Sequence, residues 1–140
     1  MKNARNCDLP QISLSLAPFL VIALLLPFYA NAAPWKDTSP FVISYITILA
    51  IKHEIDPALA LSIIWCESKM KMGAIGTLAK VGKDYGGFQI NSYWHRETME
   101  KMGLDIERSE DSLIYGVYLL KMQGEKPWRA SRRCWQAGTT

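Results

Sequence analysis

The sequence predicts a small, mainly α-helical domain that carries one short β-hairpin lobe. Helix start signals containing proline are followed by apolar residues at helical spacing along most of the chain. Five glycines gather in one interval in which that spacing disappears. The sequence contains no internal repeats, no low-complexity segment and no linker typical of a second domain. We therefore expect a single domain with a glycine-rich lobe at one side.

Residues 1–32 are typical of an export signal. Lys2 and Arg5 precede an apolar run over about residues 14–28, and Ala30-Asn31-Ala32 provides a small-x-small cleavage pattern. A membrane-spanning helix is the alternative, but the apolar run is short for a span and contains two prolines. We therefore expect cleavage after residue 32 and a periplasmic protein, which would contact a membrane only through an uncleaved signal.

Cleavage would leave residues 33–140 as one domain. These 108 of the 140 residues suffice for a single hydrophobic core. The net charge would fall from +3 to +2, because the removed segment carries Lys2, Arg5 and Asp8. So mild a charge gives no indication of nucleic-acid binding. We expect a monomer.

Two cysteines, Cys66 and Cys134, remain after cleavage, whereas Cys7 leaves with the signal. An even number of cysteines in an oxidising compartment predicts a disulfide. Closing a loop of nearly 70 residues would contribute about 4 kcal/mol to stability. Two buried thiols are the alternative, because the sequence does not fix the distance between them.

Helices are expected where a start signal precedes an apolar repeat. Ser39-Pro40 and Asp56-Pro57 are two such signals, and Ser109 is expected to cap a later helix. Glycines mark several of the expected ends. The expected helices cover about residues 40–53, 57–73, 93–102, 109–124 and 128–137.

The glycine-rich lobe is expected between Gly73 and Gly87, with Phe88-Gln89-Ile90 as its returning strand. Glycine lets another backbone or a ligand approach closely, so a lobe facing the end of the preceding helix would form one wall of a cleft. The five glycines are Gly73, Gly76, Gly82, Gly86 and Gly87.

Two carboxyl groups are candidates for catalysis at this cleft. Glu67 extends the helix face formed by Ala60, Ile63 and Ile64, and desolvation on an apolar face raises the pKa of a carboxyl. Asp84, with glycine and polar neighbours, is expected to stay ionised. Such a pair can divide the cleavage of a glycosidic bond between a proton donor and a carboxylate that faces the oxocarbenium charge. The alternatives are a surface carboxylate for Glu67 and a turn-capping carboxylate for Asp84.

Two sequence blocks resemble the lysozyme superfamily. One is Glu67-Ser68 and the other, residues 84–92, reads DYGGFQINS and begins 17 residues after Glu67. The closer similarity is to the soluble lytic transglycosylase family, especially its small exported members associated with type IV secretion, conjugation and pilus systems. Its E-S-x-x-x-x-x-A pattern is met by Glu67, Ser68 and Ala74, and its G-L-M-Q-I pattern is similar to residues 86–90. The resemblance extends over about residues 43–138.

This resemblance implies an α+β lysozyme-like fold and cleavage of the MurNAc–GlcNAc β-1,4 bond of peptidoglycan. It implies that Glu67 acts first as acid and then as base, while the 6-hydroxyl of the sugar attacks in place of water. The product would be a 1,6-anhydro-MurNAc end, formed without metal or cofactor. The implied partners are peptidoglycan glycan strands and components of a secretion, conjugation or pilus apparatus.

The resemblance also implies substrate-binding residues. Ser68 would orient Glu67 or the sugar, and Gln89, the backbone around Gly87 and Asn91 of the same block would line the sugar site. Independently of the resemblance, the ring of Trp94 offers an apolar face on which a sugar can stack.

Trp135 and Gln136 depart from the related pattern. They stand where the family's late A-Y-N-A-G block has tyrosine and asparagine, and the indole of Trp135 has no hydroxyl to replace that of tyrosine. Trp135 is nevertheless a candidate for the substrate site.

Three alternatives to the transglycosylase remain open. They are a hydrolase that uses Glu67 and Asp84, a non-catalytic peptidoglycan-binding assembly module, and a small membrane-anchored interaction protein. A metal site is not expected, because His53 and His95 lie far apart in the sequence with no third ligand in view.

Overall fold

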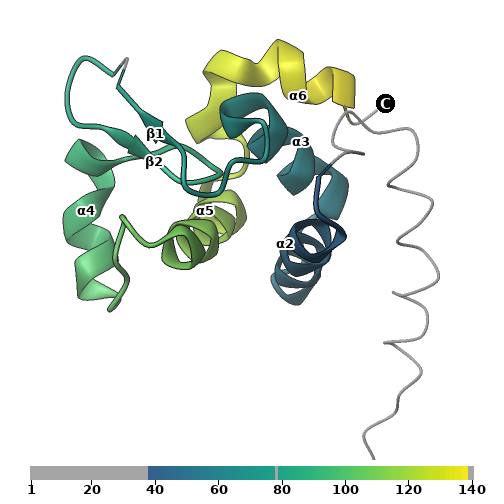
Figure 1. Cartoon of the computed structure of the whole chain (residues 1–140), viewed down its shortest axis with the longest axis horizontal. Coiled ribbons are helices and arrows are strands. Elements are labelled where there is room, and N and C mark those ends of the chain that lie inside the picture. The colour runs from purple at the N-terminus through teal and green to yellow at the C-terminus, as the bar shows by residue number, and fades with distance from the viewer. Residues whose placement is uncertain (1–37, 78, 139–140) are drawn as a thin grey trace, which may run out of the picture.

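The computed structural model describes residues 38–77 and 79–138. The expected export signal therefore lies outside the described residues. The described chain is mainly helical and contains a small three-stranded antiparallel sheet, which confirms the α+β class (Figure 1). Within these ranges no helix has both the length and the apolar composition needed to cross a bilayer. The elements are α2 (Pro40–Lys52), α3 (Pro57–Ser68), β1 (Ile75–Gly76), β2 (Asp84–Tyr85), β3 (Ile90–Asn91), α4 (Ser92–Lys101), α5 (Ser109–Gln123), the 3-10 helix η1 (Lys126–Ser131) and α6 (Arg132–Gly138).

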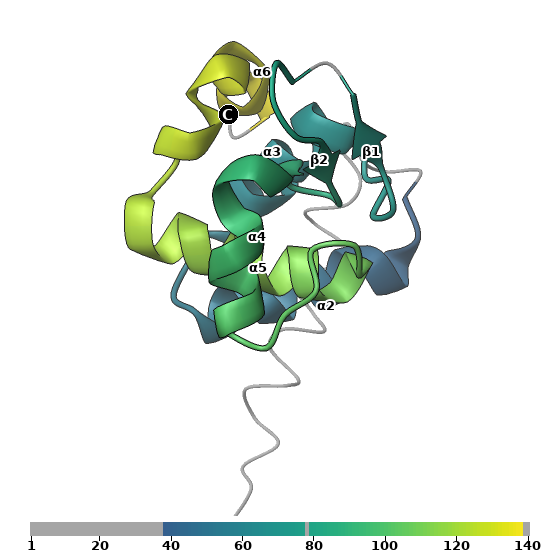
Figure 2. The same ribbon diagram turned by 90° about the vertical axis from the view of Figure 1, so that its left-hand side faces the viewer.

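Helix α3 lies between α6 and α2, as both views show (Figures 1 and 2). Its start is the predicted one: Asp56 accepts a hydrogen bond from the backbone N–H of Ala58 at 2.9 Å, and Pro57 occupies the first turn. Its apolar residues Ala60, Ile63 and Ile64 are fully buried. Glu67 lies near the C-terminal end of this helix, where it is only partly buried.

The predicted end of this helix near Gly73 is wrong. The helix ends at Ser68, because Lys69 and Met70 adopt left-handed backbone conformations with φ of 54° and 62°. Non-glycine residues rarely adopt this conformation. The prediction therefore places the helix end at the next glycine, Gly73, which lies beyond the observed end. The reversal places the Met70 side chain in the core.

The glycine-rich segment forms a three-stranded antiparallel sheet rather than a hairpin. We call residues 74–77 and 79–91 the sheet lobe. In its register, Gly76 pairs with Asp84, and Asp84 pairs with Asn91 on the third strand. Of the predicted returning strand only Ile90 belongs to β3, whereas Phe88 and Gln89 lie in the preceding turn. The sheet thus sets Asp84 on its middle strand.

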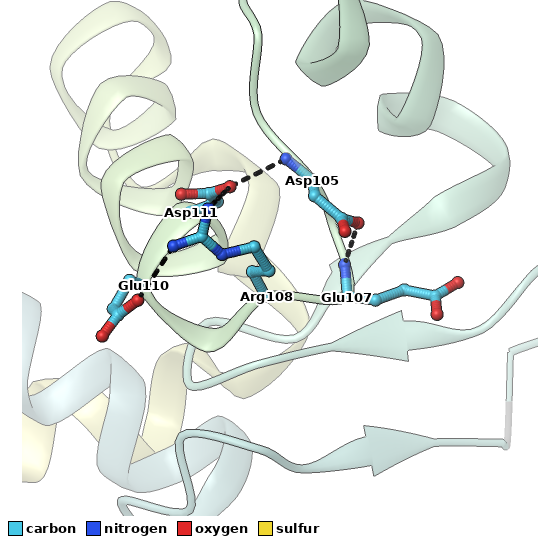
Figure 3. A network of polar contacts seen from close by, with 5 residues as sticks. All are labelled: Asp105, Glu107, Arg108, Glu110 and Asp111. Carbon is cyan, nitrogen blue, oxygen red and sulfur yellow. Dashed lines mark hydrogen bonds and ion pairs between the residues drawn. The ribbon is translucent and has the colours of Figure 1, made fainter.

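Arg108 takes the N-cap position of α5, and the prediction that Ser109 would cap this helix is wrong. Ser109 is the first helical residue, and no side chain caps the helix. The carboxylate of Asp111, in the first turn, instead accepts a hydrogen bond from the backbone N–H of Asp105 at 2.9 Å. Acidic side chains in this turn are favourable beside the positive end of the helix dipole. Figure 3 shows this network, made of Asp105, Glu107, Arg108, Glu110 and Asp111.

The C-terminal segment, predicted as one helix over residues 128–137, is divided into η1 and α6. Trp128 lies inside η1 with non-helical backbone angles and is buried. Its indole Nε1 donates a hydrogen bond to the Phe88 carbonyl at 2.9 Å, and its ring lies 5.2 Å from that of Phe88. The bend therefore brings Trp128 into the core against the sheet lobe.

The sheet lobe packs closely against α5. A Cβ atom added at Gly116 would lie 2.2 Å from the Phe88 ring, and one added at Gly86 would lie 2.2 Å from the Ser112 hydroxyl. The Ser112 hydroxyl also donates a hydrogen bond to the Tyr85 carbonyl at 3.0 Å. Ser112 and Gly116 are one helical turn apart, so a single face of α5 holds the lobe.

We predict that Gly116→Ala lowers the free energy of unfolding by about 1–3 kcal/mol, because the added methyl overlaps a fully buried ring. The helix preference of alanine over glycine, about 1 kcal/mol, offsets only part of this loss. Denaturant unfolding measures the change. Gly73→Ala is the matched control, since its new Cβ would lie 3.8 Å from its nearest neighbour. A Gly116→Ala protein as stable as the wild type would contradict the packing described.

Candidate active site

Cys66 and Cys134 form a disulfide with their Cα atoms 5.9 Å apart, in agreement with the predicted bond. The bond joins the last turn of α3 to α6. Because Cys66 precedes Glu67, the C-terminal segment is fixed covalently beside this carboxyl.

Glu67 and Asp84 line the same cavity, which has a volume of about 440 Å³. Three other predicted site residues, Gln89, Asn91 and Trp94, line it with them. The walls thus come from α3, the sheet lobe, α4, the end of α5 and η1. The fold thus brings residues from five separate parts of the sequence together at one cavity.

Glu67 is partly buried and accepts a hydrogen bond from the Ser131 hydroxyl, whose Oγ lies 2.5 Å from Oε1. Burial is the main influence on this carboxyl and raises its pKa. The Ser131 hydrogen bond acts in the opposite direction, and the charge of Asp84 adds to the rise. The net direction is upward, as expected from the apolar helix face. Such a carboxyl holds a proton more readily than an exposed one.

Asp84 is oriented by Asn91. The Asn91 side-chain Nδ2 donates to Asp84 Oδ1 at 2.8 Å and to the Val81 carbonyl at 3.0 Å. The Asn91 side-chain oxygen accepts from the backbone N–H of Tyr93 at 3.0 Å and caps α4. These three contacts hold the amide in one orientation. Asn91 therefore acts as a support for the second carboxyl.

Gln89 bonds to the backbone of the sheet lobe through its side chain. Its backbone is left-handed with φ of 53°, a conformation that costs a non-glycine residue on the order of 1 kcal/mol. Its side-chain Nε2 donates to the Gly86 carbonyl at 2.8 Å and lies 3.4 Å from the Ala74 carbonyl. A Cβ atom added at Gly76 would lie 2.5 Å from the Gln89 Oε1, so a larger residue there would displace the Gln89 amide. The geometry makes Gln89 a wall residue whose amide hydrogens bond within the lobe.

Trp94 is exposed over 67% of its surface and lies at the cavity. Its ring contacts that of Tyr93 edge to face, with centroids 4.6 Å apart. Tyr93 is exposed as well. The exposed Trp94 ring at the cavity offers an apolar face for a ring-shaped ligand.

Ser68, Gly87 and Trp135, predicted as substrate-binding residues, do not line this cavity. Ser68 is buried and donates to the Ile64 carbonyl at 3.0 Å. A Cβ atom at Gly87 would lie 3.1 Å from the Met72 side chain, so that backbone faces the core. Trp135 is only 4% exposed, and its indole N–H donates to the Trp128 carbonyl at 3.1 Å.

Sequence reasoning missed Ser131, Trp128, His95 and Lys126. The last three line the cavity, and Ser131 contacts Glu67 across 64 residues of chain. His95 lies 3.1 Å from the Tyr115 hydroxyl, and burial lowers its pKa. No motif marks Ser131, because its role depends on how η1 packs. In the described part of the chain, no group of three or more His, Cys, Asp or Glu side chains could hold a metal ion.

A second cavity, of about 460 Å³, lies between α2 and the start of α5 and is lined in part by Phe41, Tyr45 and Met72. Its charged lining residues contact one another: Arg108 lies 3.3 Å from Glu110 and 3.8 Å from Asp111. In the first cavity, by contrast, burial raises the pKa of Glu67, and a second carboxyl, Asp84, lines the same space, so we take that cavity as the candidate active site.

Comparison of the chain with family models, with curated proteins and with solved structures found no match.

We predict that Glu67→Gln stabilises the protein at neutral pH. Because folding raises the pKa of Glu67, its contribution to stability is fully present below its unfolded pKa of about 4.3 and is lost as the pH rises through the folded pKa. A neutral amide avoids that loss and can still accept the Ser131 hydrogen bond. Denaturant unfolding at several pH values measures the difference from the wild type.

The stability gain should shrink toward zero below about pH 4, where both side chains are neutral. Glu125→Gln is the control, because Glu125 is exposed and its loss removes a carboxylate without a burial cost. A Glu67→Gln protein that is less stable than the wild type at neutral pH would contradict the electrostatics of the site.

Proposed function

We propose that the chain is a lytic transglycosylase with a lysozyme-like fold that cleaves the MurNAc–GlcNAc β-1,4 bond of peptidoglycan. One observation carries the proposal: Glu67, partly buried at the end of an apolar helix, shares a cavity with a second carboxyl and an exposed tryptophan. Resemblance of the Glu67-Ser68 and 84–92 blocks to that family supplies the substrate class.

Glu67 is the proton donor of the first step. A carboxyl with a raised pKa keeps a proton that it can give to the glycosidic oxygen. The bond between that oxygen and C1 of MurNAc then breaks, and the bonding pair leaves with the GlcNAc oxygen. Positive charge develops on the MurNAc ring, and Glu67 becomes a carboxylate.

Glu67 is the base of the second step. Its carboxylate takes the proton of the MurNAc 6-hydroxyl, whose oxygen attacks C1 and forms the 1,6-anhydro ring. This step returns Glu67 to its protonated form and consumes no water. One carboxyl therefore serves both steps, with no metal or cofactor.

Asp84 stabilises the charged intermediate. Its carboxylate, oriented by Asn91, lies on the lobe side of the cavity and faces the space in which the sugar would bind. Preorganised negative charge near a developing cation lowers the barrier more than mobile water does. The Trp94 ring provides the stacking surface for a sugar.

The presence of both carboxyls in one cavity also favours a second candidate, a hydrolase that uses Glu67 as acid and Asp84 as nucleophile or base. Its product would have a reducing end in place of the anhydro ring. A non-catalytic peptidoglycan-binding module would release no product. We further propose that the protein acts in the periplasm, as expected from its export signal, and that it opens the wall locally for a secretion, conjugation or pilus apparatus, as the resemblance suggests.

We predict that Glu67→Gln lowers the release of muropeptides from sacculi by about 10²–10⁴-fold, the usual contribution of a general acid. The exported protein with its disulfide intact is incubated with sacculi, and mass spectrometry identifies the products. Anhydro-MurNAc ends that disappear in the variant support the transglycosylase. Equal digestion by both proteins would refute it, and no product from either would favour the binding module.

We predict that Asp84→Asn slows cleavage by about 10²–10³-fold but leaves the anhydro ends as the product, because Asp84 stabilises charge and forms no bond. Asn91 can still donate to the oxygen of the new amide, so the lobe keeps its geometry. The same product analysis applies. Reducing ends in the wild type that are lost in this variant would favour the hydrolase.

A further inference from the structure

The Ser131 hydroxyl has two acceptors within hydrogen-bond distance. Its Oγ lies 2.5 Å from Glu67 Oε1 and 3.1 Å from the Trp128 carbonyl oxygen. A hydroxyl carries a single hydrogen and can donate to one acceptor at a time, while its lone pairs can accept a further bond. The geometry therefore contains two hydrogen-bond arrangements, which differ in the acceptor that Ser131 uses.

We propose that Ser131 is the positioning residue of Glu67 and that its hydrogen bond reverses direction when Glu67 gains or loses its proton. With Glu67 ionised, the Ser131 hydroxyl donates to Oε1. With Glu67 protonated, the carboxyl O–H donates to Ser131 Oγ, and the Ser131 hydrogen turns to the Trp128 carbonyl. Every donor has an acceptor in both states. This inference rests on the proposed acid-then-base role of Glu67.

The Trp128 carbonyl is held in place for this exchange. The Trp135 indole N–H donates to the same oxygen at 3.1 Å, so a contact from α6 orients the carbonyl that the Ser131 hydroxyl also reaches. Trp128 itself is buried and its indole is bonded to the Phe88 carbonyl. Trp135, singled out because it has no hydroxyl, therefore contributes through its N–H.

A hydroxyl partner suits a carboxyl that must work in both protonation states. A fixed donor such as a lysine or a backbone N–H stabilises only the ionised form and lowers the pKa of the acid. Ser131 gives each form a partner, with the stronger hydrogen bond to the ionised form, and keeps the carboxyl in one place through the cycle. The Cys66–Cys134 disulfide fixes the distance between α3 and this segment. The other titratable groups of the cavity are Asp84 on β2, His95 on α4 and Lys126 on η1.

The test is a carbon-13 NMR titration of the exported protein with its disulfide intact. In the wild type, the Trp128 backbone carbonyl shift should change with the same midpoint as the Glu67 side-chain carboxyl, because protonation of Glu67 moves the Ser131 hydrogen to that carbonyl. In Ser131→Ala the carbonyl should no longer follow Glu67. The midpoint of Glu67 should also rise, since the ionised form has lost its donor.

Ser131→Thr is the matched control, because it keeps the hydroxyl and should restore both the coupled titration and the midpoint. If the product assay shows turnover, Ser131→Ala should lower kcat about tenfold or more with little change in KM, and the alkaline limb of the pH profile should move to higher pH. A wild-type Trp128 carbonyl that does not titrate with Glu67 would overturn the proposal, whether or not the alanine variant folds. Coupled titration in a protein that releases no muropeptide would leave the hydrogen-bond exchange in place and refute the proposed function separately.

Discussion

The attachment of the C-terminal segment to the end of α3 is the interaction on which the site depends. The Cys66–Cys134 disulfide makes this attachment covalent, and Trp128 anchors the same segment to Phe88 in the core. Between these two anchors lies Ser131, bonded to Glu67. Without this segment, Glu67 would lose its hydroxyl partner and part of the burial that raises its pKa. A domain of this size is only marginally stable. A disulfide between residues 68 positions apart adds about 4 kcal/mol to its free energy of unfolding.

The opposite wall depends on a different kind of contact, the close approach of α5 to the sheet lobe. Gly116 and Ser112 leave room for Phe88 and Gly86, and Gln89 and Asn91 bond the lobe internally. The two carboxyls therefore lie on regular elements, Glu67 on helix α3 and Asp84 on strand β2. A site carried by packed elements keeps its geometry better than one carried by loops. We consider this the structural basis for assigning chemistry to the cavity.

The sequence predicted the features that follow from local rules. Asp56-Pro57 marks the start of α3, helical spacing places Glu67 on the apolar face, and the paired cysteines predict the disulfide. It did not predict what tertiary packing imposes. The left-handed turn at Lys69 is one example, because burial of the next side chain offsets its local cost. The bond from Ser131 to Glu67 is another, since it joins residues 64 apart that no spacing rule connects.

Binding of a glycan fragment tests the central claim, that the cavity at Glu67 receives a peptidoglycan strand. A tetrasaccharide of alternating GlcNAc and MurNAc is added to nitrogen-15-labelled Glu67→Gln protein, which should bind without cleaving. We expect shift changes at the Trp94 indole N–H and at the side-chain amides of Gln89 and Asn91, which line the cavity. Changes confined to the second cavity, around Phe41 and Tyr45, or no change at saturating fragment, would contradict it.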